Sequence, residues 1–396
     1  MVKGLPVVDV DKDKNKKGLA LSGGGFRATL YAVGSLAKLN EEGLLAELDT
    51  ITAVSGGAIA AGHLMLKWSD LEFDPIGDGS GRVRATNFHD VIVEPLVAFC
   101  SCTILTPWKG LYHLIHPRSS MVDCVRKQYE SKLFGEIKLK DIPHTPGAPE
   151  FIFYGTNLDT GVSIRIGKES VRDYHIGSAS DHDITLAQAV SISSAFPPFL
   201  SPVHLDGSRW TWKNSEYQKL PEADVKRLRY RLTLCDGGLY DNMGLEMLWK
   251  HGGNKEFGTV FCCDAGAPFS APWNSRWRLF GNWLGKCLRM SDIMVNQQRA
   301  LRKRTLARNY QAGEYRGAYW CIENRLDFGN YYSSFAIPEK LESYLHLKRL
   351  GTQLDAFSGD DNKKLVNWGY LHTDESIRSW YDSSIKQGLA LPYPSA

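Results

Sequence analysis

The stretch that decides the fold is Gly18-Leu19-Ala20-Leu21-Ser22-Gly23-Gly24-Gly25, a short apolar run that ends in a glycine-rich turn. Apolar side chains follow at helical spacing over residues 26–42, and Gly43 provides a stop signal. The pattern then repeats, with a second apolar run over residues 49–54, the turn Ser55-Gly56-Gly57 and a helical stretch over residues 58–68. Successive strand–turn–helix units predict parallel strands joined by right-handed crossovers.

The rest of the chain adds strands and helices around these two units. Further short apolar runs predict strands at residues 151–154, 162–166, 231–235 and 259–263. The sequence therefore predicts an α/β protein with three α/β/α layers and a mostly parallel central sheet. We expect a flexible arm over residues 1–16, one domain over residues 17–265 with a mostly helical insertion at residues 71–150, and a helical extension over residues 266–396 packed on the core.

The composition is that of an ordinary globular protein. The 396 residues are 43% hydrophobic and 23% charged, with a net charge of +3, which excludes a disordered chain and gives no concentrated basic face for duplex nucleic acid. The eight cysteines form no C-x-x-C pair, so the spacing for structural zinc is missing. Residues 1–17 lack the apolar core of a signal peptide, and residues 91–107 fall short of the ~18–20 residues that span a bilayer. We therefore expect a soluble cytoplasmic protein.

The second turn has the features of a nucleophile elbow. Ser55 lies between a predicted strand and a predicted helix, where a tight turn would project its hydroxyl clear of the sheet. Small neighbours on both sides allow the strained backbone that such a turn needs. The first position of the G-x-S-x-G pattern is Ala53, which is still small. The positive end of the following helix would stabilise an alkoxide or oxyanion.

The first turn exposes several backbone N–H groups at a helix start, which suits an anion. That anion is either a phosphate or the oxyanion of a tetrahedral intermediate. A dinucleotide site needs G-x-G-x-x-G, but position 28 is Ala and no acidic residue ends the next strand. The P-loop pattern is also missing, so the serine elbow thirty residues on favours the oxyanion.

A serine nucleophile needs a base, and Asp236 is the leading candidate. It closes the predicted strand 231–235 and is followed by Gly237 and Gly238, which would place its carboxylate at the same sheet edge as Ser55. Burial beside apolar groups would raise its pKa toward a useful value. Asp264 ends another strand and competes for the role, and the plainer interpretation of Asp236 is a turn cap.

These residues resemble the patatin-like phospholipase family. The resemblance rests on four segments in family order, with Thr156-Asn157-Leu158-Asp159-Thr160-Gly161 as a fifth, similar turn. The four are Gly23-Gly24-Gly25-Phe26-Arg27, Val54-Ser55-Gly56-Gly57, residues 189–198, and Asp236-Gly237-Gly238-Leu239-Tyr240-Asp241-Asn242. They imply a Ser55–Asp236 dyad with no catalytic histidine, and an oxyanion hole at Gly24, Gly25, Phe26 and Arg27. Arg27 would either steady this loop or meet a phosphate head group. Gly57, Gly237, Gly238 and Asn242 would support the site.

The resemblance also implies a substrate and a setting. We expect a lipid acyl hydrolase that needs no metal or cofactor and cleaves phospholipid or lysophospholipid through an acyl-enzyme. An acyltransferase or neutral-lipid esterase on the same dyad is the alternative. Bacterial relatives of this size include anti-phage effectors that a cyclic nucleotide activates, so such an activator is a further expectation. The enzyme would act peripherally at the inner face of the membrane. The resemblance leaves the oligomeric state open.

Other interpretations remain open at this point. A Ser-His-Asp triad would draw on His251, His346 or His372, and a phosphate- or nucleotide-binding module would make Ser55 a bystander. Residues 273–289 interleave tryptophans with basic residues, and a basic cluster follows. This region is either an interfacial helix or, as we prefer, a helix packed on the core with a solvated basic face. Residues 91–116 are either a lid or, again preferred, a buried insertion helix. The basic cluster comprises Arg299, Arg302, Lys303, Arg304 and Arg308.

Overall fold

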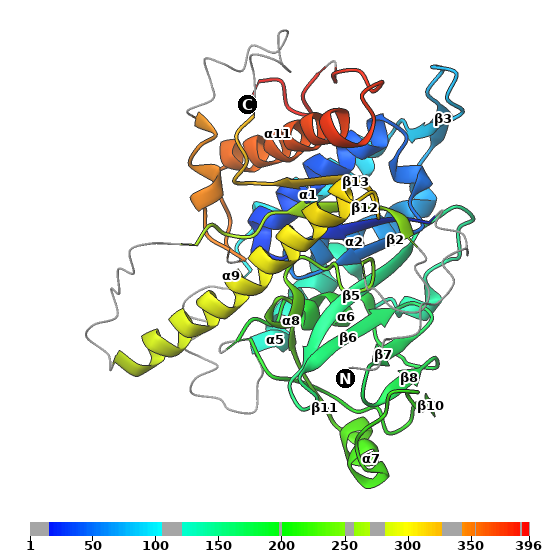
Figure 1. Cartoon of the computed structure of the whole chain (residues 1–396), viewed down its shortest axis with the longest axis vertical. Coiled ribbons are helices and arrows are strands. Elements are labelled where there is room, and N and C mark those ends of the chain that lie inside the picture. The colour runs from blue at the N-terminus through cyan, green and yellow to red at the C-terminus, as the bar shows by residue number, and fades with distance from the viewer. Residues whose placement is uncertain are drawn as a thin grey trace.

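The computed structural model describes residues 16–104, 121–197, 200–249, 257–269, 282–326, 343–352, 354–388 and 390–395. One large sheet crosses the molecule, with helices on both of its faces (Figure 1). A small hairpin of β3 (Phe73–Pro75) and β4 (Val83–Ala85) stands apart from it. The strands of the large sheet are β1 (Lys16–Leu21), β2 (Thr50–Ala53), β5 (Glu150–Asn157), β6 (Val162–Gly167), β7 (Val171–Asp173), β8 (Gly177–Ala179), β9 (Val203–Leu205), β10 (Trp212–Lys213), β11 (Leu232–Asp236), β12 (Phe257–Asp264) and β13 (Arg316–Cys321).

The sheet has a parallel centre and an antiparallel wing. Its main path runs β10-β8-β7-β6-β5-β2-β1-β12-β13, and β11 pairs with both β5 and β9. The neighbours from β5 through β2, β1 and β12 to β13 are all parallel. Strands β6 to β11 pair antiparallel. The predicted α/β fold with a parallel sheet at its centre is confirmed.

The helices form the two outer layers. They comprise α1 (Gly25–Glu41), α2 (Gly56–Lys67), α3 (Glu94–Cys100), α5 (Met121–Tyr129), α6 (Leu186–Ser193), α7 (Glu222–Tyr230), α8 (Gly238–Asp241), α9 (Asn282–Gln311) and α11 (Gly359–Ser376). Shorter 3-10 helices are η1 (Leu45–Glu47), η2 (Trp68–Asp70), η5 (Leu139–Asp141) and η7 (Leu347–Arg349), and π-helical turns are η3 (His89–Val93), η4 (Glu130–Phe134) and η8 (Ile377–Tyr381). Among the described residues no helix is long and apolar enough to cross a membrane.

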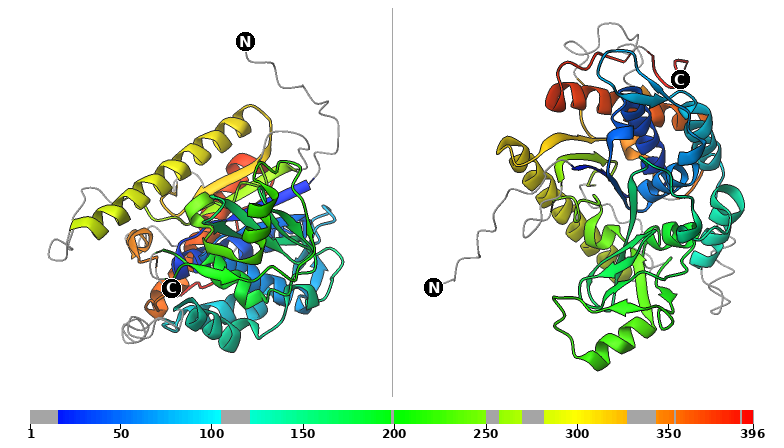
Figure 2. Two further views of the ribbon diagram at one scale, coloured as in Figure 1. Left: turned by 90° about the horizontal axis from the view of Figure 1, so that it is seen from below. Right: turned by 90° about the vertical axis from the view of Figure 1, so that its right-hand side faces the viewer.

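Alternation along the strands separates the two layers. In β1, Leu19 and Leu21 belong to the core cluster that contains α1, α2 and α11, whereas Ala20 belongs to a second cluster with Leu306 of α9. Figure 2 accordingly shows α9 and α1 on opposite sides of the strands. Helix α11 lies against α1 at glycine contacts, because a Cβ at Gly34 would come within 1.8 Å of the Val366 carbonyl oxygen.

The C-terminal region differs from the sequence prediction. Residues 266–396 were expected to be helical, but β13 lies within them and extends the sheet beside β12. Its sequence, Arg-Gly-Ala-Tyr-Trp-Cys, is aromatic-rich, a composition that favours strands as well as buried helices. The insertion at residues 71–150 likewise includes the β3–β4 hairpin beside its helices. Most of the predicted N-terminal arm, residues 1–15, lies outside the described residues.

The register of β5 sets up the site. Its first half pairs with β2, where Ala53 lies opposite Phe153. Its second half pairs with β11, which runs antiparallel to it and places Asp236 opposite Gly155. Strands β2 and β11 therefore run toward each other along β5, and their carboxyl ends meet near its middle. Asp236 was expected at the same sheet edge as Ser55, and the two residues do lie together. Strand β11 reaches this point antiparallel to β5, however, and not as a further parallel strand.

Candidate active site

Ser55 occupies a strained turn between β2 and α2. It has φ 50° and ψ −117°, and it is the one non-glycine residue with positive φ among the described residues. Such a backbone costs about 1–3 kcal/mol and persists only where its surroundings enforce it. Here a Cβ at Gly56 would lie 2.0 Å from the Gly25 carbonyl oxygen, and the Ser55 N–H donates to Ser193 Oγ at 2.9 Å. This turn therefore places Ser55 just beyond the carboxyl end of β2.

Asp236 ends β11 beside Ser55 and is almost fully buried, with 2% exposure. Its Oδ1 accepts a hydrogen bond from the Gly238 N–H at 2.6 Å. Burial raises the pKa of the Asp236 carboxyl to about 7, although the Gly238 N–H and the hydroxyl of Ser55 both act to lower it. The Ser55 side chain is thus close enough to influence the charge on this carboxylate. At neutral pH a substantial fraction of Asp236 is ionised and able to accept a proton.

The glycine turn faces the same space. Gly24 (φ 143°) and Gly25 (φ 59°) line the cavity that contains Ser55 and Asp236. Helix α1 begins at Gly25, so the first N–H groups of the helix have no acceptor within it. These N–H groups and the positive end of the helix dipole favour an anion at this point.

The side chains of Phe26 and Arg27 point away from the cavity. Phe26 is fully buried and packs edge-on against Phe99, with ring centroids 5.6 Å apart. Arg27 is 1% exposed, and its guanidinium donates to the carbonyl oxygens of Ala265, Lys348 and Leu350 at 2.8–3.0 Å. Of the two roles expected for Arg27, these contacts fit a brace for the loop, because the Arg27 guanidinium is bonded to backbone carbonyls and Arg27 does not line the cavity.

Asn242 joins the acid turn to the glycine turn. Its carbonyl oxygen accepts the Gly23 N–H at 3.0 Å, and its side chain lines the cavity. A Cβ at Gly23 would lie 2.4 Å from Asn242 Oδ1, and one at Gly238 would lie 2.6 Å from it. Gly237 and Gly57 lie against strand backbone, where a Cβ would meet Tyr154 O and Leu21 O at 2.5 and 2.6 Å. The backbone therefore requires glycine at positions 57 and 237, and a Cβ at position 23 or 238 would displace the Asn242 side chain.

The cavity has a volume of about 980 Å³. Its apolar lining comes from elements far apart in sequence, namely Met121, Phe196, Pro197, Leu200, Phe269, Leu288, Val295 and Leu354. Helix α9 closes one side with residues at helical spacing, including Leu288, Asp292, Val295 and Arg299. This wall was not predicted from the sequence, although the i, i+4, i+7, i+11 spacing of these residues is a signal that identifies one helix face.

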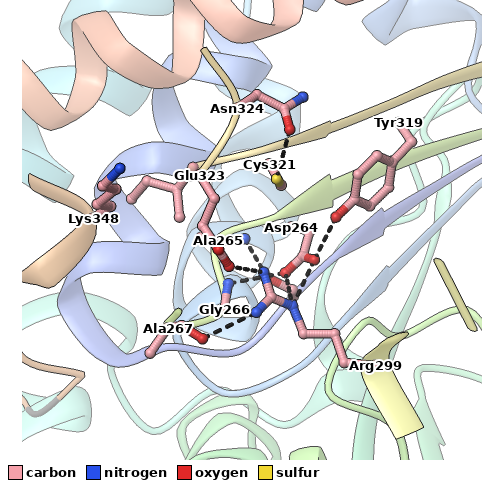
Figure 3. A network of polar contacts seen from close by, with 12 residues as sticks. Asp264, Ala265, Gly266, Ala267, Arg299, Tyr319, Cys321, Glu323, Asn324 and Lys348 are labelled. Carbon is pink, nitrogen blue, oxygen red and sulfur yellow. Dashed lines mark hydrogen bonds and ion pairs between the residues drawn. The ribbon is translucent and has the colours of Figure 1, made fainter. Parts of the chain in front are cut away.

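Asp264, the rival acid, is held by other groups. Arg299 Nε lies 2.7 Å from Asp264 Oδ2, and the Tyr319 hydroxyl and the Gly266 N–H also donate to this carboxylate (Figure 3). Burial alone would raise the pKa of Asp264, but the charge and hydrogen bonds of Arg299 hold it below its usual value. Asp264 does not line the cavity.

The basic cluster is divided between the inside and the outside. The preferred interpretation of a solvated basic face is wrong for Arg299 and Arg302. Arg299 pairs with the buried Asp264, and Arg302 lies 3.4 Å from the buried carboxylate of Asp241 and 3.0 Å from Glu246. Arg304 and Arg308 are exposed. Residues 273–281 of the proposed interfacial segment and residues 105–116 of the proposed lid lie outside the described residues. The described part of the proposed lid includes α3, which buries Leu96, Phe99 and Cys100, as a buried insertion helix does.

No histidine is found among the described residues that line the cavity. His372 is buried against Tyr31, 2.7 Å from its hydroxyl, and burial lowers its pKa to about 3. His346 pairs with Asp361 at 2.8 Å on the surface. His251 lies outside the described residues. The triad hypothesis therefore has no candidate base beside Ser55 in the described part of the chain.

A strained serine between a strand and a helix, facing a turn of free N–H groups, is the arrangement used by α/β serine hydrolases. A family model described as "Patatin-like phospholipase" matches residues 19–249, more than half of the 396-residue chain. The chain therefore belongs to the patatin-like phospholipase family.

The fold is also similar to that of a solved lipid enzyme. Human GIVD cytosolic phospholipase A2 matches with 12% sequence identity and a TM-score of 0.54, over 93% of this chain and 63% of that chain. The same human protein in complex with a methyl gamma-linolenyl fluorophosphonate inhibitor and terbium chloride matches with 14% identity and a TM-score of 0.51, over 92% and 59%. This chain thus spans less than two thirds of the human protein, and the likeness shows the fold alone. A comparison with curated proteins gave no match.

Proposed function

We propose that this protein is a lipid acyl hydrolase that cleaves fatty-acyl esters with a Ser55–Asp236 dyad. One observation carries the proposal: a buried carboxylate with a pKa of about 7 lies beside a serine held in a strained elbow. A base with a pKa near the working pH combines a useful ionised fraction with a real affinity for the proton. Family membership supports the same chemistry.

The reaction proceeds in two halves. Asp236 removes the Ser55 hydroxyl proton as Oγ forms a bond to the ester carbonyl carbon. The tetrahedral intermediate then collapses, the bond to the alcohol oxygen breaks, and protonated Asp236 returns the proton to the leaving alcohol. Water next attacks the acyl-enzyme, giving its proton to Asp236, and the fatty acid leaves as Ser55 regains its hydroxyl proton.

The oxyanion is stabilised by the glycine turn. Gly24 and Gly25 line the cavity beside Ser55 at the start of α1, where backbone N–H groups would donate to the oxyanion. Each well-placed donor contributes about 2.7–4 kcal/mol to the lowering of the barrier. Gly57, Gly237 and Gly238 would support the site by close packing of the turns, since a Cβ at each would lie 2.5–2.6 Å from a neighbouring atom, which at Gly238 is Asn242 Oδ1.

Phospholipid or lysophospholipid is the favoured substrate class. An apolar cavity of about 980 Å³ suits an acyl chain. Arg289 lines it with its guanidinium 4.0 Å from the centre of the Phe269 ring, which supplies a cation for a phosphate head group. An acyltransferase or neutral-lipid esterase would use the same dyad with an alcohol or a different ester. A nucleotide-binding module is disfavoured, because a phosphate on the glycine turn would face the Asp236 carboxylate.

Regulation and location stay predictions of the family resemblance. A cyclic-nucleotide activator, a role in anti-phage defence, oligomerisation, and action at the inner face of the membrane all belong to this part of the proposal. Assaying the purified protein with and without a panel of cyclic nucleotides tests the first point. Activity near zero until a nucleotide is added supports it, and full activity without nucleotide contradicts it.

The function is tested by lipidomics of membranes incubated with the purified chain. Wild-type protein, with the nucleotide panel present, should release fatty acids and lysolipids, and Ser55→Ala should release none above background. Ser194→Ala is the matched control, because Ser194 lines the same cavity while its hydroxyl donates to Val190 O. Equal lipid cleavage by Ser55→Ala and wild type contradicts the proposal.

A further inference from the structure

Helix α9 presents two different faces. Leu288, Asp292, Val295 and Arg299 line the cavity on one side. At about 100° per residue, Met290, Met294 and Leu301 lie on the opposite side. They are 60%, 62% and 59% exposed. Twelve large hydrophobic side chains are exposed among the described residues, and four of them, these three and Ile293, belong to α9. Scattered exposed apolar residues are normal, but a row on one helix face marks a binding surface.

The same side of α9 carries exposed cations and no acid. Lys286 lies before the apolar row, and Arg304 and Arg308 lie after it, all three exposed. The helix contains seven Lys or Arg residues and a single acid, Asp292, which faces the cavity. We call this side the outer face of α9 and define it by Lys286, Met290, Met294, Leu301, Arg304 and Arg308.

We propose that the outer face of α9 is a docking surface for an anionic lipid bilayer. A helix with an apolar row and basic residues lies in the plane of the membrane interface, with its apolar side chains among the acyl chains and its cations at the phosphates. From Lys286 to Arg308 the face extends for about 33 Å along the helix axis at 1.5 Å per residue. Figure 1 shows the N-terminal part of α9 projecting beyond the sheet and its neighbouring helices, where a flat surface can reach it.

Charge distinguishes lipid from the other occupants. A second copy of the chain would place Lys286 against Lys286 in a parallel pair, and against Arg304 or Arg308 in an antiparallel pair. Both arrangements bring like charges together. A nucleic acid requires cations along the whole contact, whereas the centre of this face consists of Met290, Met294 and Leu301. Anionic lipid satisfies both the cationic ends and the apolar centre.

The docking surface would hold the cavity about one helix diameter, ~10–12 Å, from the bilayer that carries the substrate, and this part of the argument rests on the proposed function. One face of α9 lines the cavity that contains Ser55, and the other would lie on the bilayer. Binding is therefore measured in the full-length Ser55→Ala variant, which leaves the vesicles intact. The result then stands whether or not the protein hydrolyses lipid.

The experiment is co-sedimentation of Ser55→Ala protein with vesicles of phosphatidylglycerol and phosphatidylethanolamine, and with vesicles of phosphatidylcholine. We expect binding to the anionic vesicles that weakens as NaCl is raised. Adding Met290→Glu and Met294→Glu should weaken the partition coefficient about tenfold or more, because two carboxylates replace two inserted side chains. The matched control adds Tyr230→Glu and Trp380→Glu, which introduce the same charge at side chains 65% and 78% exposed elsewhere. This control should bind like the parent.

Three results would overturn the proposal. The first is equal binding by the Met290→Glu/Met294→Glu variant and its control. The second is binding of the Ser55→Ala parent that is the same on anionic and phosphatidylcholine vesicles and does not change with NaCl. This comparison needs no further variant, so it holds even if Met290→Glu/Met294→Glu does not fold. The third is a parent dimer, seen by light scattering, that the Met290→Glu/Met294→Glu variant loses, which would assign the face to a second copy. Failure of the proposed function appears separately, as the absence of ester turnover in the protein that retains Ser55.

Discussion

Asp236 and Asp264 are two buried aspartates with nearly the same local structure and opposite electrostatics. Each ends a strand, and each accepts an N–H from the glycine two residues later, at 2.6 and 2.9 Å. Burial raises the pKa of Asp236 to about 7, whereas Arg299 holds the pKa of Asp264 below its usual value. The difference is the guanidinium in Figure 3. The Arg299 counter-ion suits Asp264 to a structural role, whereas the raised pKa of Asp236 suits the proposed role of base.

Removing the charge of Asp236 should give the largest effect. Asp236→Asn keeps the shape and an acceptor for the Gly238 N–H but cannot accept the Ser55 proton. We expect kcat for ester hydrolysis to fall by about 10³-fold or more, with the fold intact. Asp264→Asn is the comparison, and its activity per folded molecule should stay within about tenfold of wild type. Reversed effects of the two substitutions would make Asp264 the base.

Asp264→Asn should instead lower the stability. It leaves Arg299, whose side chain is 10% exposed, without its buried partner. The free energy of unfolding should fall by about 3–5 kcal/mol. Urea unfolding at neutral pH measures this loss. A stability equal to that of wild type would mean that Asp264 and Arg299 do not act as a pair.

Asp236→Asn should raise the stability in a pH-dependent way. The folded-state pKa of about 7 lies above the ordinary value of 3.8 for this carboxyl, so wild-type protein loses stability as pH rises between these values. The asparagine variant lacks this loss. Its advantage should be near zero below pH ~4, grow through pH ~5–7, and level off at about 2–4 kcal/mol. Urea unfolding across this range checks the sign, and an advantage that shrinks with rising pH contradicts it.

The smallest effect concerns the strain at Ser55. Both Ser55→Gly and Ser55→Ala should abolish activity, but glycine adopts φ 50° without the penalty that alanine retains. We expect Ser55→Gly to be more stable than Ser55→Ala by about 1 kcal/mol, measured by thermal unfolding. An alanine variant equal to or more stable than the glycine variant would show that the turn is relaxed.

The sequence predicted the parts of this comparison that depend on local pattern. The two glycine turns, the elbow serine and the strand that ends at Asp236 all follow from short stretches with strong conformational preferences. The direction of β11 was not predictable, because pairing between strands is set by tertiary packing and not by the residues of one strand. Nor was the Asp264–Arg299 pair, whose members are 35 positions apart on a strand and a helix whose packing no local pattern encodes.

The pH dependence of fluorophosphonate labelling tests the central claim most directly. The probe reacts with an activated serine, and mass spectrometry of digested protein locates the adduct. We predict an adduct on Ser55 whose rate of formation rises with pH through a midpoint near 7 in wild type and in Asp264→Asn, and nearly vanishes in Asp236→Asn. An adduct on another residue, or labelling of Ser55 at the wild-type rate in Asp236→Asn, would contradict the account.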